Sequence, residues 1–339
     1  MLERFPKFYE DFHCLGGACP HTCCALWEVV LDEDTVAAYR LLPGDLGDRL
    51  RAAMTEDQDG DVCFPLNGGR CPFLDGDNLC EIHRTLGEAA TSVTCQEHPR
   101  FIEDYGPFRE LTLSASCPEA NRLLFASPFA LAERETDEEG EEGDDWLAGL
   151  LPFRATLLEL LADGGRPIHD RLRDLLLLSC TAQALLEDED LEALAALTPA
   201  DCPELEMPQG PGLFPEALEV LEELERLEAN WTDVLAAARP LSPAPGPDPE
   251  LQRVAEYGCF RYLLKCVNDG DLLSRAQLCV FLTLAAERLA PVCGSVPEAL
   301  RRLSCEVEHS DCNLDALLEA FRWDPVCSVE RMLTELSVK

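Results

Sequence analysis

The sequence predicts a mainly α-helical protein: a loop-rich, cysteine-bearing N-terminal domain with a small β-hairpin (residues 1–132), then an all-α domain (residues 146–339). Three observations support this. Nine of the 18 cysteines lie between Cys14 and Cys117. An acidic, glycine-containing stretch follows at residues 133–145. Beyond it, leucines recur at the three- to four-residue spacing of an amphipathic helix.

Composition limits the classes of partner. The chain has 339 residues, 47% of them hydrophobic, which is enough for packed cores in two or three domains. Its net charge of -38 repels phosphate backbones and anionic membrane surfaces, so neither nucleic acid nor a membrane is expected as a partner. A lysine-rich partner suits this charge, and carboxylates that only keep the protein soluble explain it equally well.

The N-terminal residues and the apolar runs favour a cytoplasmic location. Residues 1–14 carry charges where a signal peptide needs an apolar run, and no stretch reaches ~18 uncharged apolar residues. In a reducing cytosol disulfides do not persist, and clustered thiols more often serve as metal ligands or redox groups.

The N-terminal domain has short segments and turns. Residues 27–31 are rich in strand-forming side chains, and residues 101–114 predict two short strands around a turn at Tyr105, Gly106 and Pro107. A region with so little continuous core needs a bound metal to stabilise it.

The clustered cysteines are the candidate metal ligands. They are too many for one zinc, and Cys71 and Cys80 are too widely spaced for a standard zinc knuckle. Thiolates from several loops suit an iron–sulfur cluster, with zinc as the alternative. Any single one of them could instead be a small buried hydrophobic residue. The candidate ligands are Cys14, Cys19, Cys23, Cys24, Cys71, Cys80, Cys95 and Cys117.

The acidic stretch at residues 133–145 cannot bury apolar surface, so it predicts an exposed linker. The prolines of residues 239–250 predict a break between two groups of helices. Asn313 is a predicted N-cap of the last helix. The predicted helical segments are residues 150–165, 166–197, 215–238, 251–270, 274–290 and 313–321.

The later cysteines have a different predicted role. Cys259 and Cys266 lie seven apart among aromatic and leucine residues, which favours packing in an apolar core. The same interpretation holds for Cys180, Cys279 and Cys293.

Residues 12–39, 68–101 and 111–124 resemble the flagellin lysine-N-methylase family, with paired cysteines and the elements CPFL, LG, C-PR and SCPEA in order. Residues 257–285 and 306–321 are similar to that family's helical half. The first two cysteine groups also resemble a broader group of zinc- or iron-chelating cysteine-cluster proteins.

The resemblance implies methyl transfer from S-adenosylmethionine to lysine side chains of flagellin, with a [4Fe-4S] cluster held by the cysteine domain. His98 departs from the family pattern, which more often has tyrosine before Pro-Arg. The family's cysteine positions correspond to Cys19, Cys23, Cys24, Cys71, Cys80, Cys95 and Cys117.

The cofactor site cannot be placed from motifs. No glycine pair lies in the strand-turn-helix setting of a Rossmann site, and the CysXXXCysXXCys spacing is missing from the sequence. S-adenosylmethionine would bind either at the cluster or among the helices. Residues near the presumed ligands are catalytic candidates, with hydrogen bonding to cluster sulfurs as the alternative role. They are Glu81, His83, Glu97, His98, Arg100 and Glu119.

Two functions remain open. The first is an iron–sulfur protein lysine N-methyltransferase that acts on flagellin or a similar lysine-bearing protein. The second is a non-catalytic zinc or iron protein, such as a chaperone, sensor or interaction module, whose acidic helical half docks a basic partner. The long helical half favours the enzyme, because a bare chelating domain would not require it.

Overall fold

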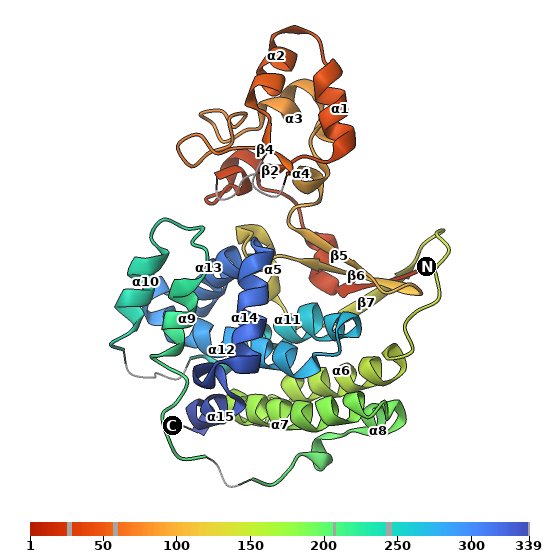
Figure 1. The fold of residues 1–339 in the computed structure, drawn as a ribbon, viewed down its shortest axis with the longest axis vertical. Coiled ribbons are helices and arrows are strands. Elements are labelled where there is room, and N and C mark those ends of the chain that lie inside the picture. Colours follow the sequence, from red (N-terminus) through yellow and green to blue (C-terminus); the bar gives the residue numbers. More distant parts are fainter. Residues whose placement is uncertain (26–28, 57–59, 206–207, 242–245, 338–339) are drawn as a thin grey trace.

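Figure 1 shows the computed structural model of the chain as a large helical body from which a smaller cysteine-bearing module projects. The structure describes residues 1–25, 29–56, 60–205, 208–241 and 246–337. The predicted mainly α fold with small β elements is confirmed. Part of the strand predicted at residues 27–31 and of the break predicted at residues 239–250 lies outside the described residues.

The projecting module has its own small core. A three-stranded sheet of order β2-β4-β3 packs with four short helices around Tyr39, Leu50 and Phe64. The Phe64 and Phe73 rings lie 4.8 Å apart in this core. The elements are β2 (Val29–Val30), α1 (Glu33–Leu41), α2 (Gly44–Ala53), β3 (Thr55–Glu56), β4 (Val62–Phe64), α3 (Glu81–Leu86) and α4 (Val93–Glu97).

A second sheet lies against the helical body. The predicted hairpin is confirmed as β5 (Arg100–Asp104) and β6 (Phe108–Leu113). The sequence did not predict β1 (Leu2–Pro6), which pairs in parallel with β6 and antiparallel with β7 (Leu131–Glu135), giving the order β5-β6-β1-β7.

The acidic stretch is therefore not entirely a linker. Its first three residues belong to β7, opposite β1. Arg4 Nε lies 2.7 Å from Glu133 Oε1, and Arg134 Nε lies 2.5 Å from Glu3 Oε2. These cross-strand ion pairs neutralise carboxylates that would otherwise repel one another, so the segment can join a sheet.

The packed cores place the boundary between the cysteine-bearing module and the helical body at a different point from the predicted one. Phe8, Phe12, Phe108 and Leu113 belong to the large core of the helical body, although they precede residue 132. Arg154 of α6 forms a buried ion pair with Glu110 of β6, with 2.6 Å between Nη1 and Oε2. This sheet is thus part of the helical body, and the separate module is confined to the residues around the smaller core.

The helical body is built around α12 (Leu272–Cys293), which packs with α7, α11 and α13. Among the described residues α12 alone is long and apolar enough to cross a membrane, and most of that apolar window is buried. The other helices are α5 (Pro118–Ala126), α6 (Leu147–Ala162), α7 (Ile168–Glu187), α8 (Leu191–Ala196), α9 (Ala217–Glu223), α10 (Trp231–Ala238), α11 (Asp248–Tyr262), α13 (Val296–Glu308), α14 (Asp311–Trp323) and α15 (Val329–Ser337).

Local capping corrects two predictions. The segment at residues 166–197 is two helices, because Asp190 accepts a hydrogen bond from Ala193 N and starts α8. Asn313 is not an N-cap, since Ser310 takes that place in α14. The Asn313 amide is instead buried, where it donates to the Glu225 and Glu306 carbonyls.

Candidate metal centre

Four of the predicted ligands line one cavity in the projecting module. Cys24, Cys71, Cys80 and Cys95 surround it together with apolar side chains such as Ile82. The cavity is small, with a volume of about 20 Å³. The structure thus gathers thiols from four separate segments around one largely apolar space.

Backbone hydrogen bonds bring these segments together. Cys71 N donates to Cys24 O at 2.7 Å, which joins the first two cysteine groups. Leu74 pairs with Cys80 in an isolated β-bridge, so the loop after Cys71 folds back on itself. This return places Cys80 directly before α3, as its N-cap residue.

Cys95 reaches the cavity from α4. Ser92 caps this helix, and its Oγ accepts a hydrogen bond from Cys95 N at 3.3 Å. The preceding segment is tied to α1, because Tyr39 donates its hydroxyl hydrogen to Ala90 O at 2.6 Å. A helix of only five residues is therefore oriented by contacts at its own start.

Burial and mutual proximity control the protonation of the thiols. Burial raises the pKa of Cys71 to about 12 and that of Cys95 to about 11, and it also raises the pKa of Cys80. Cys24 differs, because a hydrogen bond from the Cys23 thiol lowers its pKa. A cation in the cavity would favour the thiolate form of all four side chains.

The donors at this cavity are thiols, which suit both an iron–sulfur cluster and zinc. No three His, Cys, Asp or Glu side chains of the described residues lie close enough to hold a single metal ion. An iron–sulfur cluster has several irons, so its four cysteine sulfurs stay further apart than the ligands of one tetrahedral zinc. The four thiols supply the soft donors that either kind of centre requires.

The other four predicted ligands do not line this cavity. Cys23 lies beside Cys24 and hydrogen-bonds to it. Cys14 is exposed, and Cys19 donates its thiol hydrogen to His21 O at 3.3 Å. Cys117 is the N-cap residue of α5. A ligand role for these four residues stays a prediction.

The predicted catalytic residues also lie outside the lining of the cavity. Glu81 accepts two hydrogen bonds from Arg49, at 2.9 and 2.6 Å, and Glu119 is paired with Arg122. The Arg100 guanidinium lies 5.2 Å from the centre of the Phe12 ring. His83 and Glu97 are exposed on α3 and α4. The structure does not bring these side chains together, and their catalytic roles stay predictions.

His98 belongs to a polar network between the module and the helical body. Its ring centre lies 5.6 Å from that of His309. His309 Nε2 is 2.7 Å from Ser116 Oγ, which is 2.7 Å from Ser114 Oγ. Burial lowers the pKa of His98 to about 3 and that of His309 to about 4, so both imidazoles are neutral at pH 7.

The network ends on a buried carboxylate that the sequence did not single out. Glu308 accepts hydrogen bonds from Ser114 Oγ at 2.5 Å, from Tyr257 OH at 2.5 Å and from Tyr262 OH at 2.8 Å. Arg261 Nε lies 3.1 Å from the same carboxylate. The signal was present in the sequence, since the serines and Glu308 all lie in spans that resemble the methylase family.

Comparison with known proteins finds relatives for part of the chain. It is 34% identical over 142 residues to proteins named "Lysine-N-methylase" from Salmonella choleraesuis and Salmonella typhimurium. It is also 34% identical over 139 residues to the "Flagellar biosynthetic protein FliU" of Salmonella muenchen. Each match covers 38% of this chain, 34% of each methylase and 79% of FliU. No family model and no solved structure matches.

Proposed function

The chain belongs to the flagellin lysine-N-methylase-like family, and from this membership we propose that it methylates lysine side chains of a protein substrate. We propose further that Cys24, Cys71, Cys80 and Cys95 hold a [4Fe-4S] cluster and that S-adenosylmethionine is the methyl donor. The observation that carries the proposal is the meeting of four thiols at one cavity, in a chain related to proteins named as methylases.

The names of the relatives support the substrate class. Two of them are named for lysine methylation and the third for flagellar biosynthesis, so a flagellin-like protein is the proposed substrate. The matched part spans about a third of the length of the named methylases, so the activity, substrate and cytoplasmic location of the whole protein are proposals. The charge of -38 suits the approach of a lysine-bearing surface.

In this proposal, residues around the cavity control the charge of a ligand and the access of water. The Cys23 thiol donates a hydrogen bond to Cys24 and so favours a thiolate there. Phe64 and Ile82 exclude water, which strengthens electrostatic interactions inside. When bound, the cluster supplies a Lewis-acidic, redox-active iron centre. The substrate lysine must lose its proton before its nitrogen can attack a methyl group.

The proposal is tested by protein purified without oxygen and incubated with S-adenosylmethionine and flagellin. We expect flagellin to gain the mass of one or more methyl groups. The Cys71→Ser variant should lose this activity, whereas Cys63→Ala should keep it, because Cys63 is buried in the same module but does not line the cavity.

Two results would contradict the proposal. One is a methylated product formed equally by the wild-type protein and by Cys71→Ser. The other is zinc in place of iron with no methylated product, which would support the non-catalytic metal-binding function instead.

A further inference from the structure

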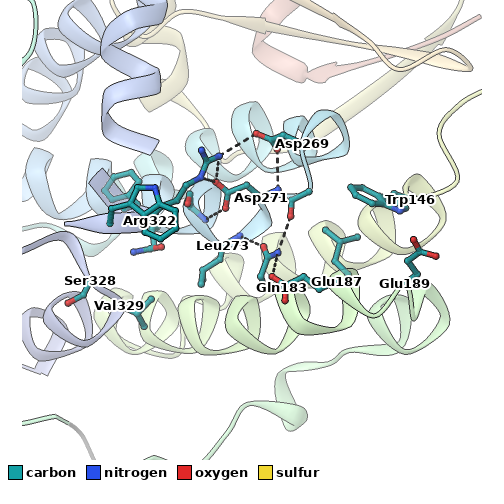
Figure 2. Close-up of a pocket in the computed structure, with 16 residues that line it drawn as sticks. Trp146, Gln183, Glu187, Glu189, Asp269, Asp271, Leu273, Arg322, Ser328 and Val329 are labelled. Carbon is teal, nitrogen blue, oxygen red and sulfur yellow. Dashed lines mark hydrogen bonds and ion pairs between the residues drawn. The ribbon is translucent and has the colours of Figure 1, made fainter. Parts of the chain in front are cut away.

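Two groups of polar side chains in the helical body differ in where their hydrogen bonds lead. One group lines a cavity of about 890 Å³ beside the end of α7, which Figure 2 shows. There Gln183 donates to Glu187 at 2.9 Å, and Arg322 lies 2.5 Å from Asp271, so these groups are paired within the wall. The other group is the network on Glu308, whose hydrogen bonds lead out of the core to an imidazole.

This network runs from the interior of the body toward its surface. The Glu308 side chain is 2% exposed, and Ser114 and Ser116 are buried. His309, at the other end, is partly exposed. Hydrogen bonds thus connect a buried carboxylate with an imidazole that solvent can reach.

His309 lies where the chain returns from the cysteine-bearing module to the body. Its ring centre is 5.6 Å from that of His98, which directly follows α4, the helix that carries Cys95 of the cysteine cavity. The next residue is tied to the body, because Ser114 N donates to Pro99 O at 2.7 Å. One short segment therefore links the network with the cavity.

The donors and acceptors of the network can be ordered from the carboxylate outward. An ionised carboxylate only accepts, so Ser114 gives its hydroxyl hydrogen to Glu308 Oε2 at 2.5 Å. Because a hydroxyl has one hydrogen, Ser114 Oγ accepts from Ser116 Oγ, 2.7 Å away. Ser116 has no hydrogen left for the imidazole, so it accepts from His309 Nε2 at 2.7 Å. The network thereby fixes His309 as the tautomer whose Nδ1 is an acceptor.

Arg261 keeps the carboxylate an acceptor and the imidazole neutral. Its Nε lies 3.1 Å from Glu308 Oε1, the oxygen that also accepts from Tyr257 and Tyr262. These donors favour the ionised form of the carboxylate. Besides burial, the charge of Arg261 lowers the pKa of His309, so a second positive group is disfavoured beside this ring. The imidazole thus suits a neutral hydrogen-bond donor better than an ammonium group.

We propose that His309 Nδ1 accepts a hydrogen bond from the neutral amine of the substrate lysine, and that Glu308 is a positioning residue that acts on His309 through the two serines. The inference rests on the proposed function for the identity of its substrate. An amine that donates one N–H to the ring has its lone pair directed away from it, so this bond orients the nucleophile. Of the two residues, His309 contacts the substrate and Glu308 fixes which ring nitrogen can accept.

The first test follows the tautomer of His309 by nitrogen NMR of the full chain labelled at histidine. We expect the signals of a neutral ring with its hydrogen on Nε2. In Glu308→Gln, the amide oxygen should take the place of Oε1, where Arg261 and both tyrosines donate, so that the amide NH2 faces Ser114. Each hydroxyl then reverses its direction, and His309 should change to the tautomer with its hydrogen on Nδ1.

The second test measures methyl transfer to flagellin. Glu308→Gln should lower kcat/KM about tenfold, the effect of one lost hydrogen bond. Ser116→Ala interrupts the chain without touching the buried ion pair, and it should show a similar loss. Circular dichroism and iron content of each variant establish that it is folded.

Glu306→Gln is the matched control. Glu306 lies on the same helix and is also buried, but it accepts from Leu227 N and Glu228 N, outside the network. This variant should keep the wild-type tautomer of His309 and the wild-type kcat/KM.

Contact with the amine is measured by adding flagellin without a methyl donor and following the Nδ1 signal of His309. We expect flagellin to shift this signal, whereas flagellin with acetylated lysines, which lacks the amine, should leave it in place. Any of three results would overturn the inference: a wild-type ring with its hydrogen on Nδ1, an Nδ1 signal that responds equally to both flagellins or to neither, or unchanged kcat/KM in Glu308→Gln and Ser116→Ala. Failure of the proposed function is distinguishable, because Nδ1 would respond to flagellin and yet the wild-type protein would transfer no methyl group.

Discussion

The helical body buries Cys259, Cys266 and Cys279 among leucine and aromatic side chains, whereas the projecting module arranges its cysteines around a cavity. In the body each thiol acts as a small apolar group within a core that already excludes water. In the module four cysteines line one cavity together with apolar side chains. The difference teaches that burial alone does not separate the two sets of cysteines, because only those of the module line a shared cavity.

The two cores also differ in extent. The module's core consists of a few side chains such as Leu50 and Phe73, and the body's core continues through most of its helices. Since a small domain buries too little apolar surface to be stable alone, the module should depend on the proposed metal centre. The body should not.

Removal of the proposed metal centre should have the largest effect on the stability of the module. When iron is removed by oxidation with a chelator, amides of α1 to α4 should lose their protection from hydrogen exchange, while those of α12 keep it. Hydrogen exchange followed by mass spectrometry measures both regions in one sample. Equal protection of the module before and after iron removal would show that its apolar core alone keeps it folded. The proposed difference in metal dependence between module and body would then be wrong.

Breaking the buried ion pair between the sheet and the body gives the next largest effect. Glu110→Gln leaves Arg154 buried without a counter-charge, which should cost about 3–5 kcal/mol of unfolding free energy. Denaturant unfolding measures it. Glu133→Gln is the control, because its pair with Arg4 is much more exposed than the buried pair and should contribute less than about 1 kcal/mol. Similar losses in the two variants would contradict the assignment of this sheet to the body.

The junction between the regions should be sensitive to acid. Burial holds the pKa of His309 at about 4, well below its usual value near 6.5, so the unfolded chain takes up a proton before the folded chain does. The contribution of His309 to the free energy of unfolding is therefore fully present above about pH 6.5. It falls by roughly a few kcal/mol as the pH decreases toward 4.

The acid effect is measured by comparing unfolding free energies of wild-type protein and His309→Gln between pH 7 and pH 4. The variant should show a shallower loss. Burial raises the pKa of Glu306 to about 7, which acts in the opposite sense, but this contribution is the same in both proteins and cancels. Parallel pH profiles would show that His309 is not responsible.

The smallest effect is expected at Glu81, close to the centre but outside it. Its pair with Arg49 is partly exposed, so Glu81→Gln should cost about 0.2–1 kcal/mol and leave the iron content unchanged. Thermal unfolding and iron analysis check both values. A loss of iron in this variant would show that Glu81 contributes to metal binding, contrary to its place outside the lining of the cavity.

Local patterns predicted much of this architecture. Leucine periodicity located α6, α7, α11 and α12, and the turn at Gly106 located the hairpin β5-β6. The parallel pairing of β1 with β6 joins segments about a hundred residues apart, and no local pattern encodes it. The same limit explains why the acidic stretch was predicted as a linker, although Arg4 and Arg134 stabilise its start as a strand.

The candidate site was predictable only in part, because local patterns do not encode long-range contacts. Clustering and spacing identified the cysteines as a set, but the four around the cavity are selected by contacts such as the bond from Cys71 N to Cys24 O. The network on Glu308 was missed because its partners, Ser114 after β6 and the tyrosines of α11, are distant from it in the sequence. Charge and residue type indicate such groups, and only tertiary packing brings them together.

The most direct test of the central claim is the iron and sulfide content per chain of single cysteine variants purified without oxygen. Serine at Cys24, Cys71, Cys80 or Cys95 should abolish or severely reduce both, whereas Cys63→Ala and Cys117→Ser should retain the wild-type content. Full iron and sulfide in the first four variants, with loss in Cys117→Ser, would show that the cavity is not where the cluster binds.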